Sequence, residues 1–150
     1  MQNIKKSPRH LARSLAVQGL YAYQTNEASA SEIIDFLNNN EPDLFAEANY
    51  ELMNYLLVSG IEQFELMIGK YIGYMNRPMS EVNKIEKAVL VVAAIELSNN
   101  ASVPAAVIIN EAVELAKLYG GEDSFKFING LVDKLANALR HDEITNYKKK

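Results

Sequence analysis

The sequence contains no cysteine among its 150 residues, which excludes disulfide bonds, thiolate metal sites and cysteine nucleophiles. It has only two histidines, His10 and His141, and neither has a second metal ligand at helical spacing. We therefore expect no metal site. A chain of this length can bury about 68–70% of the surface that its unfolded form exposes, so one hydrophobic core can stabilise it without cross-links.

Long hydrophobic segments are also missing. The longest uninterrupted apolar run, 88–95, has eight residues, whereas a helix that spans a bilayer needs about 20. Residues 1–6 are basic, but no apolar stretch follows them, so they do not form a secretory signal. We expect a cytoplasmic protein that does not contact membranes.

Groups typical of catalysis are scarce as well. We find no Ser/His/Asp arrangement, no histidine pair and no glycine-rich loop that could hold a phosphate, and the many carboxylates sit where a solvated helix face would place them. The sequence therefore predicts a binding protein that is not an enzyme and that needs no cofactor.

Glycine and proline are few, with seven and four residues, and no segment alternates apolar and polar residues as a strand would. We expect an all-α, compact bundle of six to seven helices. Caps, breaks and apolar spacing predict helices over 8–24, 30–40, 44–71, 83–97, 105–119 and 124–139. The third is expected to be one long helix, bent near Gly60, and the polar segment after Arg140 is expected to fray.

The segment 83–97 is apolar almost all round, which is typical of a helix at the centre of a fold. The first helix, by contrast, has a buried face, a basic shoulder with Arg9 and Arg13, and three residues that a helical wheel directs away from the core: His10, Val17 and Tyr21. Val17 and Tyr21 either form a contact surface for another protein or are buried because the helix is packed on both faces.

Charge is distributed unevenly along the chain, although its net value is −4. Residues 1–24 contain four basic residues (Lys5, Lys6, Arg9 and Arg13) and no acidic one, whereas residues 25–68 contain nine acidic residues and no Lys or Arg. This separation is either a chance feature of a solvated surface or an anion-binding patch beside an acidic flank.

The last predicted helix carries a buried stripe of Ile128, Leu131, Val132, Leu135 and Leu139, with Phe125 near its edge. Phe127 lies about 100° from the centre of this stripe, close to the direction of Lys134, and Lys126 faces outward. An aromatic ring flanked by lysines can stack a nucleobase while the ammonium groups bind phosphates. The alternative is that Phe127 packs against a neighbouring helix.

Several segments resemble the NusB family: Leu20-Tyr21 after the arginine-bearing first helix, NKIEKAVLVVAAIEL over 83–97, Val103-Pro104 and, above all, INEAVELAKLYGGEDSFKFINGLVDKL over 109–135. The resemblance covers nearly the whole chain, but 25–79 matches only in pattern. It implies an all-α fold of two packed helical subdomains, which we place at 1–79 and 80–140, followed by a tail at 141–150.

The resemblance also implies a function in transcription antitermination. Members of the family bind the boxA element of ribosomal RNA leader transcripts as a heterodimer with NusE, a small-subunit ribosomal protein. The pair joins NusA, NusG and RNA polymerase, which then resists Rho-dependent termination.

Carried over by position, the resemblance assigns an RNA surface that contains Arg9, Arg13, Asp123, Lys126 and Phe127, and a partner surface that contains Tyr21 and Glu86. Relatives often have a dense arginine cluster at the start of the first helix, which His10 and Leu11 interrupt here. Lys5 and Lys6 compensate in charge but lack the bidentate fork of arginine. We therefore expect weak RNA binding without the partner.

Two alternatives compete with this interpretation. Some RNA cytosine methyltransferases carry a NusB-like domain at their N-terminus, but this sequence has no glycine-rich methyl-donor site, so we expect the free factor and not part of such an enzyme. The other alternative is a protein-interaction module that does not bind RNA.

Overall fold

The computed structural model describes residues 6–121 and 123–149, with side chains described as far as Thr145. All regular structure in these residues is helical, which confirms the predicted all-α class. The elements are α1 (Pro8–Asn26), α2 (Ala30–Asn40), α3 (Pro42–Glu47), α4 (Tyr50–Glu62), α5 (Phe64–Gly69), η1 (Ile72–Tyr74), η2 (Met79–Glu81), α6 (Lys84–Asn99), α7 (Ala105–Tyr119), α8 (Ser124–Leu139) and α9 (His141–Lys149).

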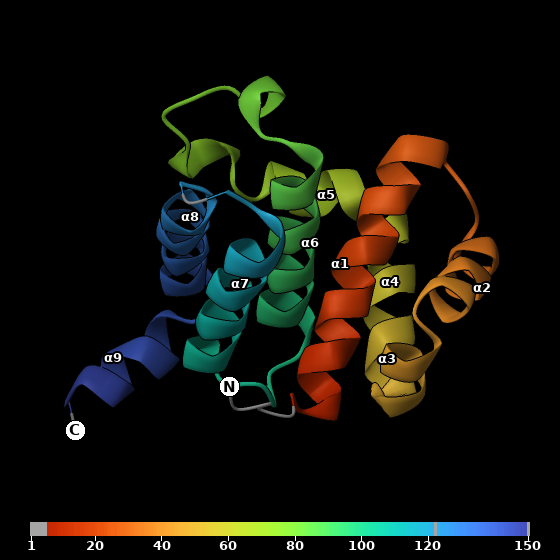
Figure 1. Ribbon diagram of the computed structural model, residues 1–150. Helices are drawn as coiled ribbons and strands as arrows, with labels where there is room; N and C mark the ends of the chain where they lie inside the picture. The colour runs from red at the N-terminus through yellow and green to blue at the C-terminus, as the bar shows by residue number, and fades with distance from the viewer. Residues whose placement is uncertain (1–5, 122, 150) are drawn as a thin grey trace.

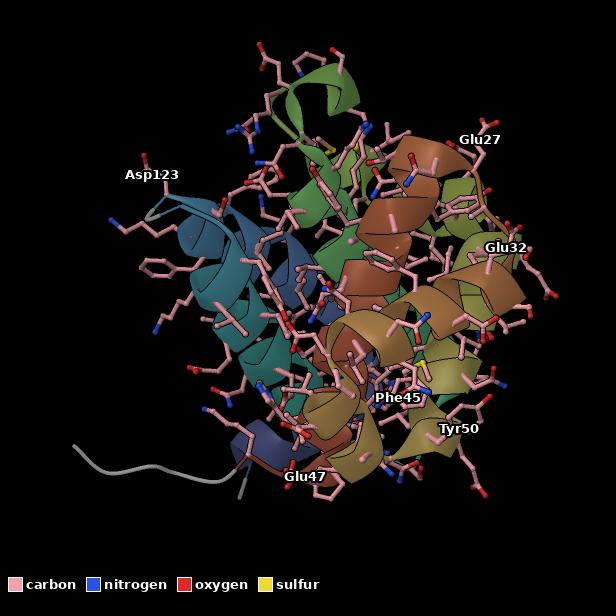
Figure 2. All side chains as sticks on the ribbon, turned by 45° about the vertical axis from the view of Figure 1, so that its right-hand side comes forward. Glu27, Glu32, Phe45, Glu47, Tyr50 and Asp123 are labelled. Carbon is pink, nitrogen blue, oxygen red and sulfur yellow. The ribbon has the colours of Figure 1, made fainter. Side chains whose placement is uncertain are left out.

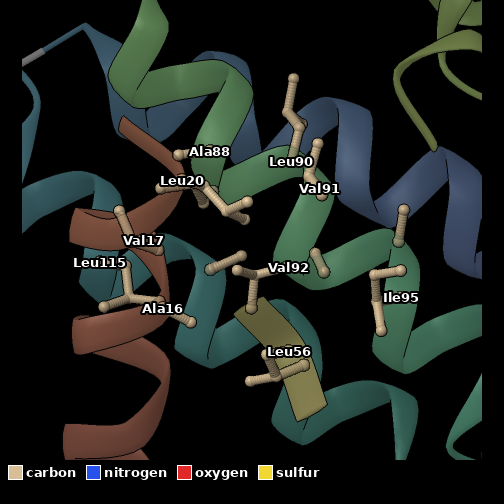
Figure 3. Close-up of a cluster of buried hydrophobic side chains, with 14 of the residues drawn as sticks. Ala16, Val17, Leu20, Leu56, Ala88, Leu90, Val91, Val92, Ile95 and Leu115 are labelled. Atoms are coloured by element: carbon tan, nitrogen blue, oxygen red, sulfur yellow. The ribbon is translucent and has the colours of Figure 1, made fainter. Parts of the chain in front are cut away.

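Helix α6 lies at the centre of the fold, as its apolar sequence predicted. Figure 1 shows α1 and α4 on one side of α6 and α7 and α8 on the other, and α5 also packs against it. Its apolar side chains from Ala88 to Leu97 are buried, and Figure 3 shows Val91 and Val92 of α6 in one cluster with Leu20 of α1 and Leu56 of α4. This single core joins the two sides; the division into subdomains at 79–80 stays a prediction.

The start of α1 follows its local sequence. The side chain of Ser7 accepts a hydrogen bond from the backbone N–H of His10 at 3.1 Å, and Pro8 occupies the first turn, where its missing N–H costs nothing. Further along, α1 approaches α4 closely: a Cβ added to Gly60 would lie 2.9 Å from Cδ1 of Leu20. The missing side chain of Gly60 thus allows Leu20 of α1 to pack closely against α4.

The prediction of one long helix from Asp43, bent near Gly60, is wrong. The segment forms α3, α4 and α5, and the first break has a clear cause at Asn49. The Asn49 side chain accepts from the N–H of Leu52 at 3.0 Å, and its backbone N–H donates to the carbonyl of Pro8 at 2.9 Å. Asn49 therefore begins a new helix and ties it to the start of α1.

The helical-wheel prediction for α1 is only partly right. Tyr21 is 43% exposed, as expected, but His10 is 8% and Val17 0% exposed, so these two do not point into solvent. The physical reason is that α1 packs against α2 and α4 on one side and α6 on the other. Burial of Val17 thus matches the alternative of a helix packed on both faces.

The prediction that the segment after Arg140 frays is wrong, because residues 141–149 form helix α9. The Arg140 guanidinium donates to four backbone carbonyls, those of Glu96, Leu97, Asn100 and Val103, at 2.9–3.1 Å. These bonds satisfy carbonyls at the end of α6 and attach the start of α9 to it. Leu139, placed in the buried stripe by its spacing, is 41% exposed. No helix in the described ranges is long and apolar enough to cross a membrane.

Candidate nucleic-acid interface

The predicted RNA-binding residues do not form one continuous patch. Arg9 lines a groove with Ser7, Ser102, Pro104 and Val107, where the start of α1 meets the loop between α6 and α7. The start of α8, which carries the other residues, lies at the opposite end of the bundle (Figure 1). Lys6 is exposed beside Ser7, and Lys5 falls outside the described residues.

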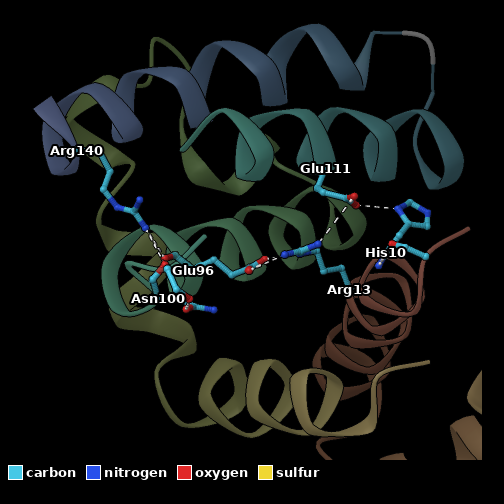
Figure 4. A network of polar contacts seen from close by, with 8 residues as sticks. His10, Arg13, Glu96, Asn100, Glu111 and Arg140 are labelled. Carbon is cyan, nitrogen blue, oxygen red and sulfur yellow. Dashed lines mark hydrogen bonds and ion pairs between the residues drawn. The ribbon is translucent and has the colours of Figure 1, made fainter. Parts of the chain in front are cut away.

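Arg13 faces the protein interior. It is 3% exposed and donates to the Glu96 carboxylate from Nε at 2.6 Å and from Nη2 at 3.0 Å, while Nη1 lies 3.9 Å from Glu111 (Figure 4). Burial alone lowers the pKa of Arg13, but the hydrogen bonds and charge of Glu96 and the charge of Glu111 outweigh it and raise the pKa. Because the guanidinium is used inside the fold, we leave Arg13 out of the RNA surface.

The opposite end of this network is His10, whose Nδ1 lies 2.7 Å from Oε2 of Glu111 on α7. Figure 4 shows His10, Glu111, Arg13 and Glu96 linked in sequence. These four side chains connect α1 to α6 and α7 through polar contacts. A helical wheel of α1 alone does not reveal these contacts.

Lys126 is exposed at the start of α8, as predicted. It lines a groove between α7 and α8, together with Phe125 and Asn129 of α8 and with five residues of one face of α7: Ala106, Ile109, Asn110, Val113 and Lys117. The ammonium of Lys117 lies 5.2 Å from the centroid of the Phe125 ring, within the range of a cation–π contact. None of the described residues lining this groove is acidic.

Phe127 is half-buried and packs against the core, and a cation covers one face of its ring. The guanidinium carbon of Arg77, in the loop between η1 and η2, lies 3.7 Å from the ring centroid. This geometry agrees with the alternative that Phe127 packs against a neighbouring element. Arg77 was not identified from the sequence, because a single arginine before a proline carries no periodic signal.

Glu86 is 5% exposed, and its carboxylate is occupied within the chain. Oε2 accepts from the hydroxyl of Ser124 at 2.9 Å, Oε1 accepts from the N–H of Asn83 at 3.1 Å, and Nη2 of Arg77 lies 3.7 Å from Oε1. Glu86 therefore fixes the start of α8 against α6, which leaves little of it for a partner protein.

Asp123 and Lys134 are both exposed on α8 or at its start. Asp123 occupies the N-cap position, but its side chain makes no capping hydrogen bond, and its backbone is helical rather than extended. Its carboxylate therefore does not cap α8. Lys134 lies eight residues beyond Lys126, about 12 Å along the helix axis.

Tyr21 lines a hollow with Asn83, Lys84 and Ile85 of the α6 start and with Tyr119–Gly121 at the end of α7. Val17, the other predicted contact residue on α1, lies fully inside the core. Of the three predicted partner residues, Tyr21 alone has a substantially exposed side chain.

The acidic segment 25–68 forms a separate part of the surface. Figure 2 shows Glu27, Glu32 and Glu47 on the side of α2 and α3, whereas Asp123 lies at the far side of the molecule, beside α8. Backbone and side-chain hydrogen bonds with Ser29 lower the pKa of Glu32, so this carboxylate is ionised at neutral pH. A polyanion is repelled there and favoured at the α7–α8 side.

These features define a small all-α protein with a central apolar helix and a cationic groove beside its last long helix. A model of the NusB family matches residues 10–137. The chain belongs to the NusB family, which confirms the resemblance noted in its sequence.

Curated relatives and a solved structure agree with this assignment. The chain is 40% identical over 146 residues to the transcription antitermination protein NusB of Chromobacterium violaceum, and the match covers 97% of each chain. It is 40% identical over 138 residues to the same protein of Paraburkholderia xenovorans, covering 92% of this chain and 94% of the relative. The fold is similar to that of T. maritima NusB, with a TM-score of 0.73 at 22% identity over 89% and 93% of the two chains. The named relatives support transcription antitermination as the function.

Proposed function

We propose that this chain is the RNA-binding antitermination factor that recognises the boxA element of ribosomal RNA leader transcripts together with NusE. In this proposal the heterodimer joins NusA, NusG and RNA polymerase, and the polymerase then resists Rho-dependent termination. Membership of the NusB family and the names of the relatives support the antitermination role.

The observation that carries RNA binding is the separation of exposed charge. Lys6 and Arg9 at the start of α1, and Lys126 and Lys134 on α8, are exposed and lie outside the acidic segment 25–68. In a protein with a net charge of −4, exposed cations outside the acidic segment are the groups that can contact a polyanion.

The hollow that contains Tyr21 supports a role in binding NusE. A half-exposed tyrosine beside apolar Ile85 offers an amphipathic ring at the surface of this hollow. Tyrosine is enriched in protein–protein contacts because its ring contributes apolar area and its hydroxyl can bond at the wet edge.

The test measures RNA binding and heterodimer formation separately. Fluorescence anisotropy with a single-stranded boxA oligoribonucleotide, and with a scrambled oligonucleotide as control, gives RNA affinity with and without NusE; calorimetry gives the affinity for NusE. We expect specific boxA binding that is stronger with NusE. Equal binding of the boxA and scrambled RNA would contradict the proposal, and binding of NusE without any binding of RNA would support the protein-interaction module.

Single variants test which surface binds RNA and which binds NusE. Lys126→Ala is expected to weaken RNA binding and leave NusE binding unchanged, whereas Tyr21→Ala is expected to weaken NusE binding by about tenfold or more. Lys84→Ala is the charge control for Lys126→Ala, since it removes an exposed lysine away from α8, in the hollow at Tyr21, and should leave RNA affinity unchanged.

A further inference from the structure

The loop between η1 and η2 brings a cation to the start of α8, and Figure 1 shows this loop and the start of α8 at the same end of the bundle. We propose that Arg77 of this loop is an RNA-binding residue, whose guanidinium lies against Phe127 and contacts a phosphate of the strand that reaches α8. The inference rests on the proposed RNA-binding function and extends it by assigning a contact that no periodic pattern in the sequence indicates.

The backbone on the C-terminal side of Arg77 is held in place. Pro78 restricts the residue before it to extended conformations, and the carbonyl of Pro78 accepts from the N–H of Glu81 at 3.0 Å, at the end of η2. Val82, directly after η2, is 4% exposed and belongs to the core. The loop is therefore anchored just after Arg77, so this side chain leaves the backbone from a defined point.

Two neighbours hold the guanidinium of Arg77. Its carbon lies 3.7 Å from the centroid of the Phe127 ring, well within the range of a cation–π contact. Nη2 lies 3.7 Å from Oε1 of Glu86, which is longer than a hydrogen bond, so Glu86 attracts Arg77 by charge. The other oxygen of Glu86 accepts from the hydroxyl of Ser124, the first residue of α8, at 2.9 Å. Arg77 is thus fixed beside the first turn of α8.

The fold does not complete the hydrogen bonds of this guanidinium. Arginine carries five N–H donors in a planar fork, and Nε of Arg77 is buried without a hydrogen-bond partner among the described residues. The side chain as a whole is still 36% exposed. A cation that is held in place, partly exposed and short of acceptors is suited to bind an external anion. A phosphate fits best, because two of its oxygens match the fork.

Stacking on Arg77 is compatible with the predicted contact between Phe127 and RNA. Phe127 is half-buried, and the guanidinium covers one face of its ring. A strand that meets the exposed part of this ring would bring its phosphates close to Arg77, and Lys126, the residue before Phe127, is exposed as well. Aromatic and cationic side chains at one place are the usual combination for binding a single strand.

Location decides between RNA and the partner protein as the source of the anion. The hollow at Tyr21, to which we assign NusE, is lined by 83–85 and 119–121, and Arg77 is not one of its lining residues. Arg77 instead lies on the ring of Phe127, in the helix that carries Lys126. We therefore assign the anion to RNA, and a carboxylate of NusE is the alternative that the experiment has to exclude.

The first experiment measures the salt dependence of boxA binding by the full chain with NusE at saturating concentration. Arg77→Met keeps the length of the side chain and removes its charge. Loss of one phosphate contact should make the slope of log K against log salt shallower by about 0.7, which corresponds to binding about fourfold weaker at roughly 0.15 M salt. Arg77→Lys keeps the charge but loses the fork, so it should keep the wild-type slope and regain part of the affinity. Lys84→Ala, the charge control away from α8, should change neither quantity.

Uncharged phosphates in the RNA test the contact directly. A methylphosphonate replaces one phosphate of the boxA oligoribonucleotide at a time, next to a 2′-deoxynucleotide that prevents strand cleavage; the same oligonucleotide with an ordinary phosphate is the control. At the position that Arg77 contacts, the replacement should weaken binding by the wild type and have little further effect on Arg77→Met. A purely structural role of Arg77 would not single out one phosphate, since only groups in contact lose additivity.

The possible failures are distinguishable. An unchanged salt slope for Arg77→Met, or the absence of any phosphate coupled to Arg77, would overturn the inference while RNA binding by the wild type stands, even where the melting temperature of the variant falls. Weaker NusE binding by Arg77→Met in calorimetry, with unchanged RNA affinity, would show that Arg77 binds the partner and would also overturn it. Absence of boxA binding by the wild-type heterodimer would overturn the proposed function and this inference together.

Discussion

Arg13 of α1 and Glu96 of α6 form a two-point ion pair inside the core, with Nε to Oε1 at 2.6 Å and Nη2 to Oε2 at 3.0 Å. Arg13 is 3% and Glu96 1% exposed. Both ions have lost most of their hydration; their mutual bonds compensate for that loss, and the nearby Glu111 adds a favourable charge for Arg13 alone. The pair therefore fixes how α1 sits on α6, since any shift would leave a buried charge without its partner.

Breaking this pair should be costly. Arg13→Ala leaves the Glu96 carboxylate buried without its main partner, and we expect it to lower the free energy of unfolding by about 3–5 kcal/mol. The double variant Arg13→Met, Glu96→Leu removes both charges and should recover most of that loss. Urea unfolding followed by circular dichroism measures all three proteins. A loss below about 1 kcal/mol for Arg13→Ala would show that the pair contributes little.

The sequence could not reveal this role of Arg13. Its own helix shows only that Arg13 lies on a shoulder one turn from Arg9, and a basic shoulder suits both an RNA surface and an internal ion pair. Whether Arg13 faces RNA or forms an internal ion pair depends on Glu96, 83 residues away, and on the packing of α6 and α7 against α1. The same dependence explains Val17, which is buried because α1 is covered on both faces.

Helix ends were easier to predict, because a cap depends on residues within three or four positions. Ser7 and the Ser29–Glu32 pair have the capping bonds that their spacing predicts, and Asn83 with Glu86 forms a further capping box. Asn49 was missed, since its capping role competed with an apolar pattern that continued through it. The groove at Phe125 was missed because it requires α7 and α8 to lie side by side.

The salt dependence of the RNA-binding constant should give the number of cationic side chains that contact phosphates. For single-stranded RNA each contact contributes about −0.7 to the slope of log K against log salt. The variant Arg9→Ala, Lys126→Ala should therefore make the slope shallower by about 1.4. Titrations of boxA RNA at four or more salt concentrations measure this slope. As the control, Lys84→Ala should leave it unchanged, and an unchanged slope in the double variant would exclude both residues as phosphate contacts.

Asp123 should oppose RNA binding without stabilising α8 as a cap. Its carboxylate is exposed at the start of α8, near Lys126, and makes no capping bond. Like charges repel within a Debye length of about 8 Å at physiological salt. Asp123→Asn should therefore tighten RNA binding, and Asp123→Ala should do the same.

Stability separates this expectation from a capping role. Loss of a working cap costs about 0.5–2 kcal/mol when alanine replaces aspartate, whereas both Asp123 variants should melt close to the wild-type temperature. RNA affinity and thermal melting are measured side by side for the two. Weaker RNA binding by Asp123→Asn would show that the carboxylate accepts a hydrogen bond from the RNA or orders a basic neighbour.

Attachment of α9 should weaken in acid, through Glu143. Its carboxylate accepts a hydrogen bond from the backbone N–H of Ala105, at the start of α7, at 2.7 Å, and this bond is the main cause of its lowered pKa. Burial opposes the shift, and the hydrogen bond and charge of Arg140 lower the pKa further. A carboxyl group whose pKa is lower in the folded chain stabilises the fold above its ordinary pKa of 4.5. That contribution is lost as the pH falls through the lowered value.

The variant Glu143→Gln reproduces this loss at neutral pH. Because the Glu143 side chain is 40% exposed, solvent screens its ion pair, and we expect the variant to be less stable than the wild type by at most about 1 kcal/mol at pH 7. The difference should shrink towards zero as the pH falls below the lowered pKa of Glu143, where the wild-type carboxylate is protonated as well. Asp142→Asn, which alters an exposed carboxylate in the same turn, is the matched control and should show a smaller effect. Chemical unfolding at several pH values measures these differences, and a gap between wild type and Glu143→Gln that stays unchanged at every acidic pH would show that the amide disturbs α9 by its shape and not by its missing charge.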